Sequence, residues 1–156
     1  MSSQTKIRKI ALLAEIKKLI ASKVPAAQLD LTNLFVAHYC NEVDAEDFLA
    51  CSASDWATLS MSHLGFGNEF QRGAPKMRSS NSKQSENGWE ATGTVIELVN
   101  DDMLFLVDSI AMEINRQGIA IQLLLHPLFA ATRDQHGVLF KLDDARCRRR
   151  RGQRSR

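Results

Sequence analysis

The sequence lacks several of the patterns by which functional classes are recognised. It has no apolar run of about 18 residues, the length that a membrane-spanning helix needs. It has no CxxC, HxH or HExxH pattern and no glycine-rich phosphate motif, so we expect no catalytic, cofactor-binding or metal-ligating residue in this chain. Lysines interrupt the N-terminal apolar pattern and exclude a signal peptide. The three cysteines are therefore expected to be reduced thiols, and the location cytoplasmic.

Basic charge is concentrated at one end of the chain. The sequence has 20 lysine and arginine residues against 18 aspartate and glutamate residues, a net charge of +2. Residues 146–156 hold seven arginines and no acid, so removing those seven charges from +2 leaves −5 for residues 1–145. The body is therefore mildly acidic, and binding to nucleic acid would depend on the tail alone.

The Arg-rich tail, residues 145–156, is open to three interpretations. It is a nucleic-acid-binding arm of salt-dependent affinity, a disordered and solvated end, or the read-through of a shifted reading frame. The tail has no interleaved aromatic residues, so stacking on bases is not supported. Because the hydrophobic pattern stops abruptly at residues 142–144, we favour the third interpretation.

Apolar residues recur every three to four positions in the first part of the chain, which predicts a helical segment over residues 1–70. Stop and cap signals divide it into four expected helices: one ending at Val24-Pro25, one over 29–43, a short one capped by Asp44, and one capped by Ser54 and ended by Gly65 and Gly67. Each helix carries one apolar stripe, so a small antiparallel bundle is expected.

The pattern changes after residue 70. Residues 71–88 hold one large apolar residue, Met77, and are otherwise mostly small or polar, which predicts a linker. In residues 89–144 we expect a strand over 94–99, a helix over 103–117, and strands over 119–125 and 138–142. This β-α-β-β order predicts an α+β protein whose second part is an incomplete ferredoxin-like unit.

Asn100, Asp101 and Asp102 form an acidic corner between the expected strand and helix. They can cap the helix, where acids are favoured by its dipole. Alternatively they bind a ligand: free N–H groups at the helix start would hold an α-carboxylate, and a side-chain carboxylate would pair with an α-ammonium group. Capping explains them without a ligand, and they are the only candidate ligand-binding residues in the chain.

One long segment resembles a known family. VNDDMLFLVDSIAMEINRQGIAIQLLLHP, from Val99 to Pro127, is similar to the N-terminal region of the large bacterial NAD-specific glutamate dehydrogenases, where the stretch reads much like VNDDMPFLVDSVTMELNRxGLxIHLxIHP. The resemblance covers about residues 30–140, with Leu104 at the position of the family's proline, and it ends beyond Asp144. It implies an ACT-type module preceded by helices, and hence a regulatory or assembly role.

The resemblance also implies which partners to expect. NAD would be the cofactor of the parent enzyme and not of this chain, whose partners would be the rest of that enzyme or further copies, with an amino-acid effector. We interpret the chain as a truncated N-terminal region of that enzyme, without activity alone. Two alternatives stay open: an independent ACT-like amino-acid-binding protein, which should close its own ferredoxin-like unit, and a nucleic-acid-binding protein, which the acidic body disfavours.

Overall fold

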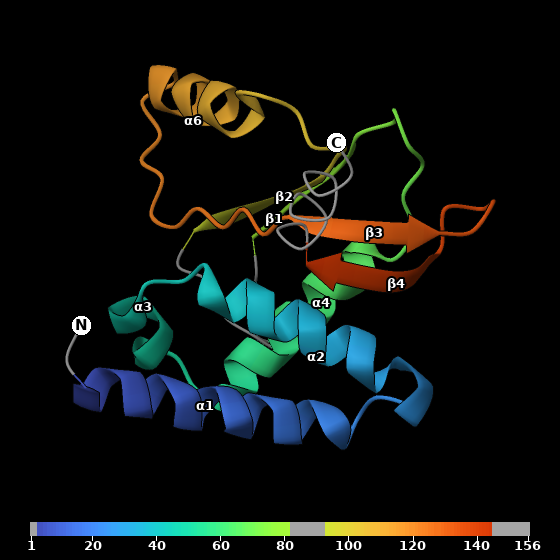
Figure 1. Cartoon of the computed structure of the whole chain (residues 1–156). Coiled ribbons are helices and arrows are strands. Elements are labelled where there is room, and N and C mark those ends of the chain that lie inside the picture. The colour runs from blue at the N-terminus through green and yellow to red at the C-terminus, as the bar shows by residue number, and fades with distance from the viewer. Residues whose placement is uncertain (1–2, 82–92, 145–156) are drawn as a thin grey trace, which may run out of the picture.

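The computed structural model of the chain describes residues 3–81 and 93–144. Four helices come first: α1 (Ser3–Ala21), α2 (Ala26–Asn41), α3 (Ala45–Ala50) and α4 (Ala53–Gly67). They are followed by β1 (Lys76–Asn81), β2 (Thr94–Val99), α6 (Leu106–Arg116), β3 (Phe129–Arg133) and β4 (Leu139–Asp144). Figure 1 shows α1–α4 at one end of the molecule, two strand pairs above them, and α6 at the far end. The expected α+β class is confirmed.

The four expected helices are present, with shifted boundaries. Asp44 stands at the start of α3 as expected, but its side chain makes no capping hydrogen bond. α4 is capped by Ser52 and not by Ser54, because the Ser52 hydroxyl oxygen accepts a hydrogen bond from the backbone N–H of Asp55 at 3.1 Å. Gly65 and Gly67 do not end α4 with a left-handed turn. The helix runs through Gly67, and its last carbonyl oxygens are bonded by side chains instead.

The expected linker over 71–88 contains a strand, so that part of the prediction is wrong. β1 pairs antiparallel with β2, with Arg78 opposite Glu97 and Lys76 opposite Val99. The polar composition of 76–81 does not prevent pairing, because β2 supplies backbone partners and an opposite charge across the pair. Residues 82–88 of the linker and the whole Arg-rich tail lie outside the described residues. The division into domains stays a prediction.

The strand expected over 119–125 does not form within the described chain. Those residues are irregular, and the strand that pairs with β4 is β3, ten residues further on. The order β-α-β-β therefore holds from β2 to β4, with its middle strand displaced. The two strand pairs form separate two-stranded sheets and not one ferredoxin-like sheet.

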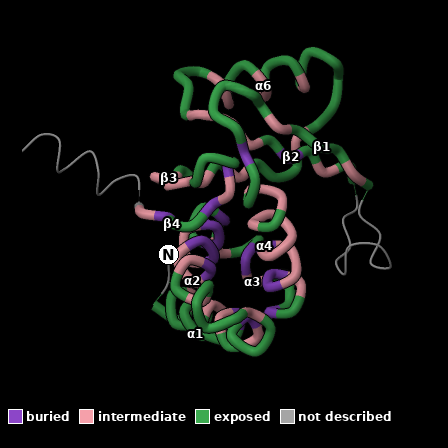
Figure 2. The backbone as a smooth tube through the Cα atoms, turned by 90° about the vertical axis from the view of Figure 1, so that its right-hand side faces the viewer, coloured by how far each residue is buried: buried purple, intermediate pink, exposed green. Residues whose placement is uncertain are grey.

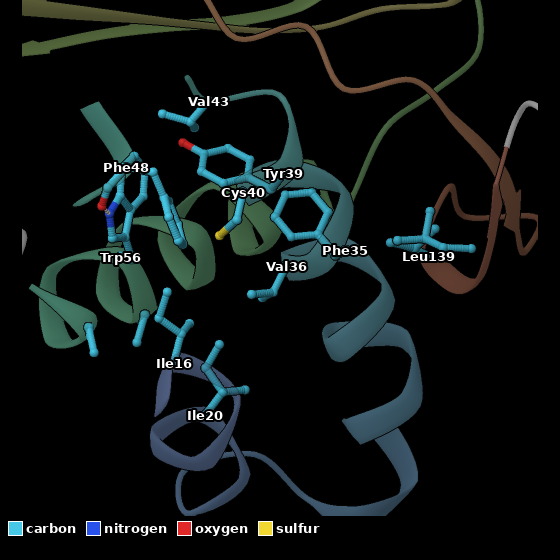
Figure 3. Packing of buried hydrophobic residues seen from close by; sticks show 13 residues of the cluster. Ile16, Ile20, Phe35, Val36, Tyr39, Cys40, Val43, Phe48, Trp56 and Leu139 are labelled. Atoms are coloured by element: carbon cyan, nitrogen blue, oxygen red, sulfur yellow. Dashed lines mark hydrogen bonds between the residues drawn. The ribbon is translucent and has the colours of Figure 1, made fainter. Parts of the chain in front are cut away.

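The hydrophobic core lies in the helical unit, by which we mean α1–α4. Its buried residues come from the four helices, the turn after α2, and β4: Ile16, Ile20, Phe35, Val36, Tyr39, Cys40, Val43, Phe48, Ala53, Trp56, Ala57, Leu139 and Leu142. Figure 3 shows Trp56 against Phe48, and the rings of Tyr39 and Phe35 beside each other. The helices thus bury their apolar stripes mainly against one another. Figure 2 shows most of the buried residues gathered among these helices.

The β3–β4 hairpin is attached to this core. The Phe129 ring stacks on Phe35 of α2 with centroids 5.2 Å apart. At the hairpin turn, the backbone N–H of Phe70 donates to the Gly137 carbonyl at 3.0 Å, and that of Leu139 donates to the Asn68 carbonyl at 2.8 Å. The hairpin is therefore fixed both by apolar packing and by backbone bonds to the segment after α4.

Candidate functional site

A row of four polar side chains joins the helical unit to the β1–β2 hairpin; we name it the polar chain. The Tyr39 hydroxyl on α2 lies 2.7 Å from Nδ1 of His63 on α4. The other ring nitrogen, Nε2, lies 3.5 Å from Oε1 of Glu97 on β2. Glu97 in turn accepts two hydrogen bonds from the Arg78 guanidinium on β1, one of them from Nη2 at 2.8 Å. Four elements therefore meet along this row, in which hydrogen bonds join Tyr39 to His63 and Arg78 to Glu97, and the His63 ring approaches Glu97 at 3.5 Å.

Burial sets the charge states along the polar chain. Tyr39 is 3% exposed, and burial raises the pKa of its hydroxyl, so it stays protonated. Burial lowers the pKa of His63 below its ordinary value; Glu97 opposes this shift and Arg78 adds to it. The bond to Glu97 raises the pKa of Arg78. At neutral pH the row therefore holds a neutral tyrosine, a neutral imidazole and a carboxylate paired with a guanidinium.

The C-terminal end of α4 is a second junction. The Lys76 ammonium of β1 donates to the Phe66 carbonyl at 2.8 Å, and the Arg133 guanidinium of β3 donates to the Gly67 and Asn68 carbonyls, each at 2.8 Å. Cations at this end are favoured by the helix dipole and satisfy carbonyls that have no partner within the helix. One residue from each strand pair thus binds the same helix end.

The acidic corner does not cap α6, so the capping prediction is wrong. The helix begins at Leu106, with Phe105 at the N-cap position and no side-chain cap. Instead, Oδ2 of Asp101 accepts a hydrogen bond from the backbone N–H of Gly73 at 2.9 Å, and Oδ1 lies 3.4 Å from Nε of Arg72. Asp101 therefore connects the end of β2 to the turn before β1. Whether Asn100, Asp101 and Asp102 bind a ligand stays a prediction.

Apolar side chains are exposed around α6. None of the residues of this helix is buried, although its sequence is strongly amphipathic. We define the α6 surface as the exposed large apolar residues of this region: Met103, Leu104, Phe105, Met112, Ile119, Leu123 and Leu124. Leu104 is 88% and Phe105 74% exposed, and Figure 2 shows α6 as a mixture of exposed and intermediate residues, with none buried. Phe105 also has a φ of 61°, in the left-handed region that residues with a Cβ rarely adopt. An exposed patch of this kind is typical of an interaction site.

The part of the chain that the structure describes contains no group of three or more histidine, cysteine, aspartate or glutamate residues able to hold a metal ion. No helix among the described residues is long and apolar enough to cross a membrane. Burial raises the pKa of the Cys40 thiol to about 12, so this cysteine packs as a protonated core residue.

Comparison with known proteins identifies the family. Residues 35–155 match the family described as glutamate dehydrogenase, ACT1 domain. The chain belongs to this family. Among the glutamate dehydrogenase relatives, the NAD-specific glutamate dehydrogenase of Halomonas elongata is 32% identical over 128 residues, which are 81% of this chain and 8% of the relative. That of Pseudomonas aeruginosa is 33% identical over 93 residues, 60% of the chain and 5% of the relative. No solved structure matches significantly.

Most of the structural features fall inside the range that matches the ACT1 family, residues 35–155. It includes the polar chain, the acidic corner and the α6 surface, while α1 and the first part of α2 precede it. It also runs past Asp144 to residue 155, beyond the point where the resemblance was expected to end. The resemblance to NAD-specific glutamate dehydrogenases is confirmed, and the chain spans less than a tenth of the length of these two relatives.

Sequence reasoning missed the polar chain, since its members are far apart in the sequence. Glu97 gave the one available signal. It is a carboxylate between Val95 and Val99 on one face of an otherwise apolar strand. A carboxylate on the apolar face of a strand is rare unless it is paired with another group. Its presence there predicts a cationic or imidazole partner.

Proposed function

We propose that this chain serves as an assembly and regulatory region of an NAD-dependent glutamate dehydrogenase and does not carry out hydride transfer. The parent reaction converts L-glutamate, NAD and water into 2-oxoglutarate, ammonia and NADH. Membership of the ACT1 family supports the proposal, as does the sequence, which lacks the glycine-rich turn of a dinucleotide-binding unit. The observation that carries it is the α6 surface, a set of exposed apolar side chains that lies outside the core of the helical unit.

We propose that the α6 surface docks on the remainder of the glutamate dehydrogenase polypeptide. More than nine tenths of each of the two relatives lies outside the part that this chain matches, so the relatives contain ample chain to cover the surface. Residues 119–125 are uncharged and alternate in apolar character, which suits them to pair with a strand edge of that partner. Burying a single exposed leucine or phenylalanine contributes about 1.5–3 kcal/mol, enough to change affinity more than tenfold.

Binding in trans tests this docking. The labelled chain is mixed with Halomonas elongata glutamate dehydrogenase from which the matched region has been removed, and complex formation is followed by sedimentation velocity. We expect binding that falls at least about tenfold when Leu104→Lys and Phe105→Lys are combined. Ile7→Lys, on α1, is the matched control because Ile7 is 64% exposed and outside the α6 surface; it should bind normally.

Three results would count against the docking proposal. Absence of any complex would exclude the remainder of the enzyme as partner, and an equal loss in the Ile7→Lys control would exclude the α6 surface. Self-association of the chain that the double variant abolishes would identify a second copy as the occupant. Separately, the pure chain is expected to form no NADH from L-glutamate and NAD, and measurable NADH formation would contradict the assignment of a non-catalytic role.

We further propose that the acidic corner binds the α-ammonium group of an amino-acid effector through Asp101 or Asp102. Asp101→Asn keeps an oxygen that can accept the Gly73 N–H, so the fold should persist while the charge that pairs with an ammonium is lost. We expect Asp101→Asn or Asp102→Asn to abolish the heat of binding in calorimetric titrations with each common L-amino acid, at unchanged thermal stability. Asn100→Ala, at the neutral member of the corner, is the control. No binding by the wild-type chain, or unchanged binding by both Asn variants, would leave Asp101 with a structural role only.

A further inference from the structure

Four consecutive backbone carbonyls at the end of α4, those of residues 66–69, are bound by two side chains, one from each hairpin. The Lys76 ammonium of β1 binds the first and the fourth of these carbonyls, at 2.8 and 3.1 Å. The Arg133 guanidinium of β3 binds the second and the third, each at 2.8 Å. We name this arrangement the nested clamp. Because the two sets of carbonyls interleave on one short stretch, each side chain holds the backbone that the other one binds.

The stretch has little conformational stability of its own. Gly65 and Gly67 lie in the last turn of α4, and glycine weakens a helix because it has the greatest backbone freedom to lose. The last carbonyls of a helix also have no partner within the helix. The conformation of residues 66–69 therefore depends on bonds from outside the helix, which Lys76 and Arg133 supply.

Aromatic rings at the two ends of the stretch add a second layer of contacts. The centroid of the Phe66 ring lies 4.8 Å from the Lys76 ammonium and 4.6 Å from the Arg78 guanidinium. The centroid of the Phe70 ring lies 5.4 Å from the Arg133 guanidinium. A cation over the face of a ring is attracted electrostatically. Cations of β1 thus hold one end of the stretch, and a cation of β3 holds the other.

The turn of the β3–β4 hairpin is bonded to the same stretch through the backbone. The backbone N–H of Leu139 donates to the Asn68 carbonyl at 2.8 Å, and that of Phe70 donates to the Gly137 carbonyl at 3.0 Å. Both bonds require residues 68–70 to stay in place. The two hairpins form separate sheets, and Figure 1 shows both on the same side of the helical unit. The stretch at the end of α4 is therefore backbone that both hairpins bind.

We propose that residues 66–70 couple the two hairpins, so that attachment of β1 through Lys76 strengthens attachment of the β3–β4 turn, and the reverse. The two states of the stretch are a clamped one, with its carbonyls bound, and a frayed one, in which they face water. A partner that holds one hairpin favours the clamped state and so tightens the other, because coupling free energies are reciprocal. This device goes beyond the proposed docking role. It concerns how binding at the α6 surface, which follows β2 in the chain, affects the β3–β4 hairpin.

The coupling should be strongest at the turn of the β3–β4 hairpin. The body of this hairpin is also held by the core, through stacking of Phe129 on Phe35 and through the buried Leu142. Those contacts do not involve residues 66–70. The amides of Leu139 and Phe70, whose bonds join the turn to the stretch, are therefore the positions that report the coupling.

Amide hydrogen exchange resolved by NMR tests the coupling on the full chain. Lys76→Met keeps the aliphatic stem and removes the ammonium that binds two carbonyls. We expect protection of the Leu139 and Phe70 amides to fall about tenfold, although Lys76 bonds to neither, while protection of α1 stays constant. Arg72→Met is the matched control. The Arg72 side chain is 92% exposed and pairs with Asp101, outside the nested clamp, so this variant should leave both amides unchanged.

The reverse variant tests reciprocity. Arg133→Met removes the bonds to the inner two carbonyls and should lower protection of the β1 and β2 amides. Lys141→Met is its control, since the exposed Lys141 pairs with Asp143 on the same hairpin, and it should leave β1 and β2 unchanged. In Lys76→Met combined with Arg133→Met, the loss at Leu139 should be smaller than the product of the two single losses, because the stretch frays only once.

The other outcomes decide against the coupling. Unchanged protection of Leu139 and Phe70 in Lys76→Met would overturn it, as would losses in the double variant equal to the product of the single losses. An equal fall in Arg72→Met would show that the effect does not come from the nested clamp. Should Lys76→Met fail to fold, Lys76→Gln, which keeps a donor without the charge, should show a smaller fall at the same two amides. None of these measurements involves the remainder of glutamate dehydrogenase, so failure of the coupling is distinguishable from failure of the docking proposal.

Discussion

Trp56→Ala is expected to lower the free energy of unfolding by about 3–5 kcal/mol, which is a large fraction of the stability of a small domain. Trp56 is 3% exposed and lies at the centre of the core. Its ring centroid is 5.3 Å from that of Phe48 and 6.4 Å from that of Tyr39. The indole N–H also donates to the Phe48 carbonyl at 2.9 Å. The alanine variant would leave a cavity between α2, α3 and α4, together with a buried carbonyl that has lost its donor.

Urea denaturation followed by far-UV circular dichroism measures this loss, because the signal does not depend on the removed indole. Trp56→Phe separates the two contributions: it retains most of the ring packing and should lose less, chiefly the hydrogen bond. Met77→Ala is the control for an apolar side chain outside the core, since Met77 is 70% exposed, and should change stability by no more than about 0.5 kcal/mol. A loss below 1 kcal/mol for Trp56→Ala would contradict the assigned core.

The helical half of the fold could be predicted from the sequence because its signals are local. Periodic apolar residues and cap residues lie within a few positions of one another, so the four helices were found with only their boundaries displaced. Ser52 rather than Ser54 caps α4, since only the hydroxyl of Ser52 reaches the N–H of Asp55. The same short-range logic located β2 and the left-handed Gly118 after α6, where φ is +75°.

The strand pairs were less predictable because pairing is non-local. Residues 119–125 alternate as a strand should, but within the described chain no strand pairs with them, and the backbone bonds of β4 are made by 129–133. Residues 76–81 have a composition typical of a linker, yet they pair with β2 across a long loop. Alternation reports which face of a strand is apolar, and it does not report which strand lies beside it.

The candidate site shows the same contrast between signals that are local in the sequence and contacts that are not. The corner at Asn100–Asp102 stands out in the sequence because three polar residues are adjacent, but it cannot cap α6, which begins at Leu106. Asp101 instead binds a turn 28 positions earlier. The polar chain needed four elements to be in place before its members could be recognised as neighbours. Contacts of long sequence separation are visible only in the fold.

Gly137→Ala is expected to lower the free energy of unfolding by roughly 2–5 kcal/mol, because two separate penalties act at one position. Gly137 has a φ of +83°, where a residue with a Cβ is strained by about 1–2 kcal/mol. A Cβ there would also lie 2.5 Å from the Phe70 carbonyl oxygen, a backbone atom that cannot turn aside. Overpacking of this kind adds about 1–3 kcal/mol.

Gly118→Ala is a matched control that separates the two penalties. Its φ is +75°, close to that of Gly137, but a Cβ there would meet nothing within 4 Å, so only the conformational strain of about 1–2 kcal/mol should appear. Thermal and urea denaturation of both variants would give the difference, which measures the close approach of the hairpin turn to Phe70. Because that approach carries the backbone bonds between the β3–β4 hairpin and the segment after α4, Gly137→Ala should also lower hydrogen-exchange protection in β3 and β4 more than in β1 and β2. Equal losses in the two variants would mean that the turn moves away from Phe70 without penalty. Apolar packing of Phe129 and Leu139, together with the Arg133 bonds to the end of α4, would then hold the hairpin on the helical unit.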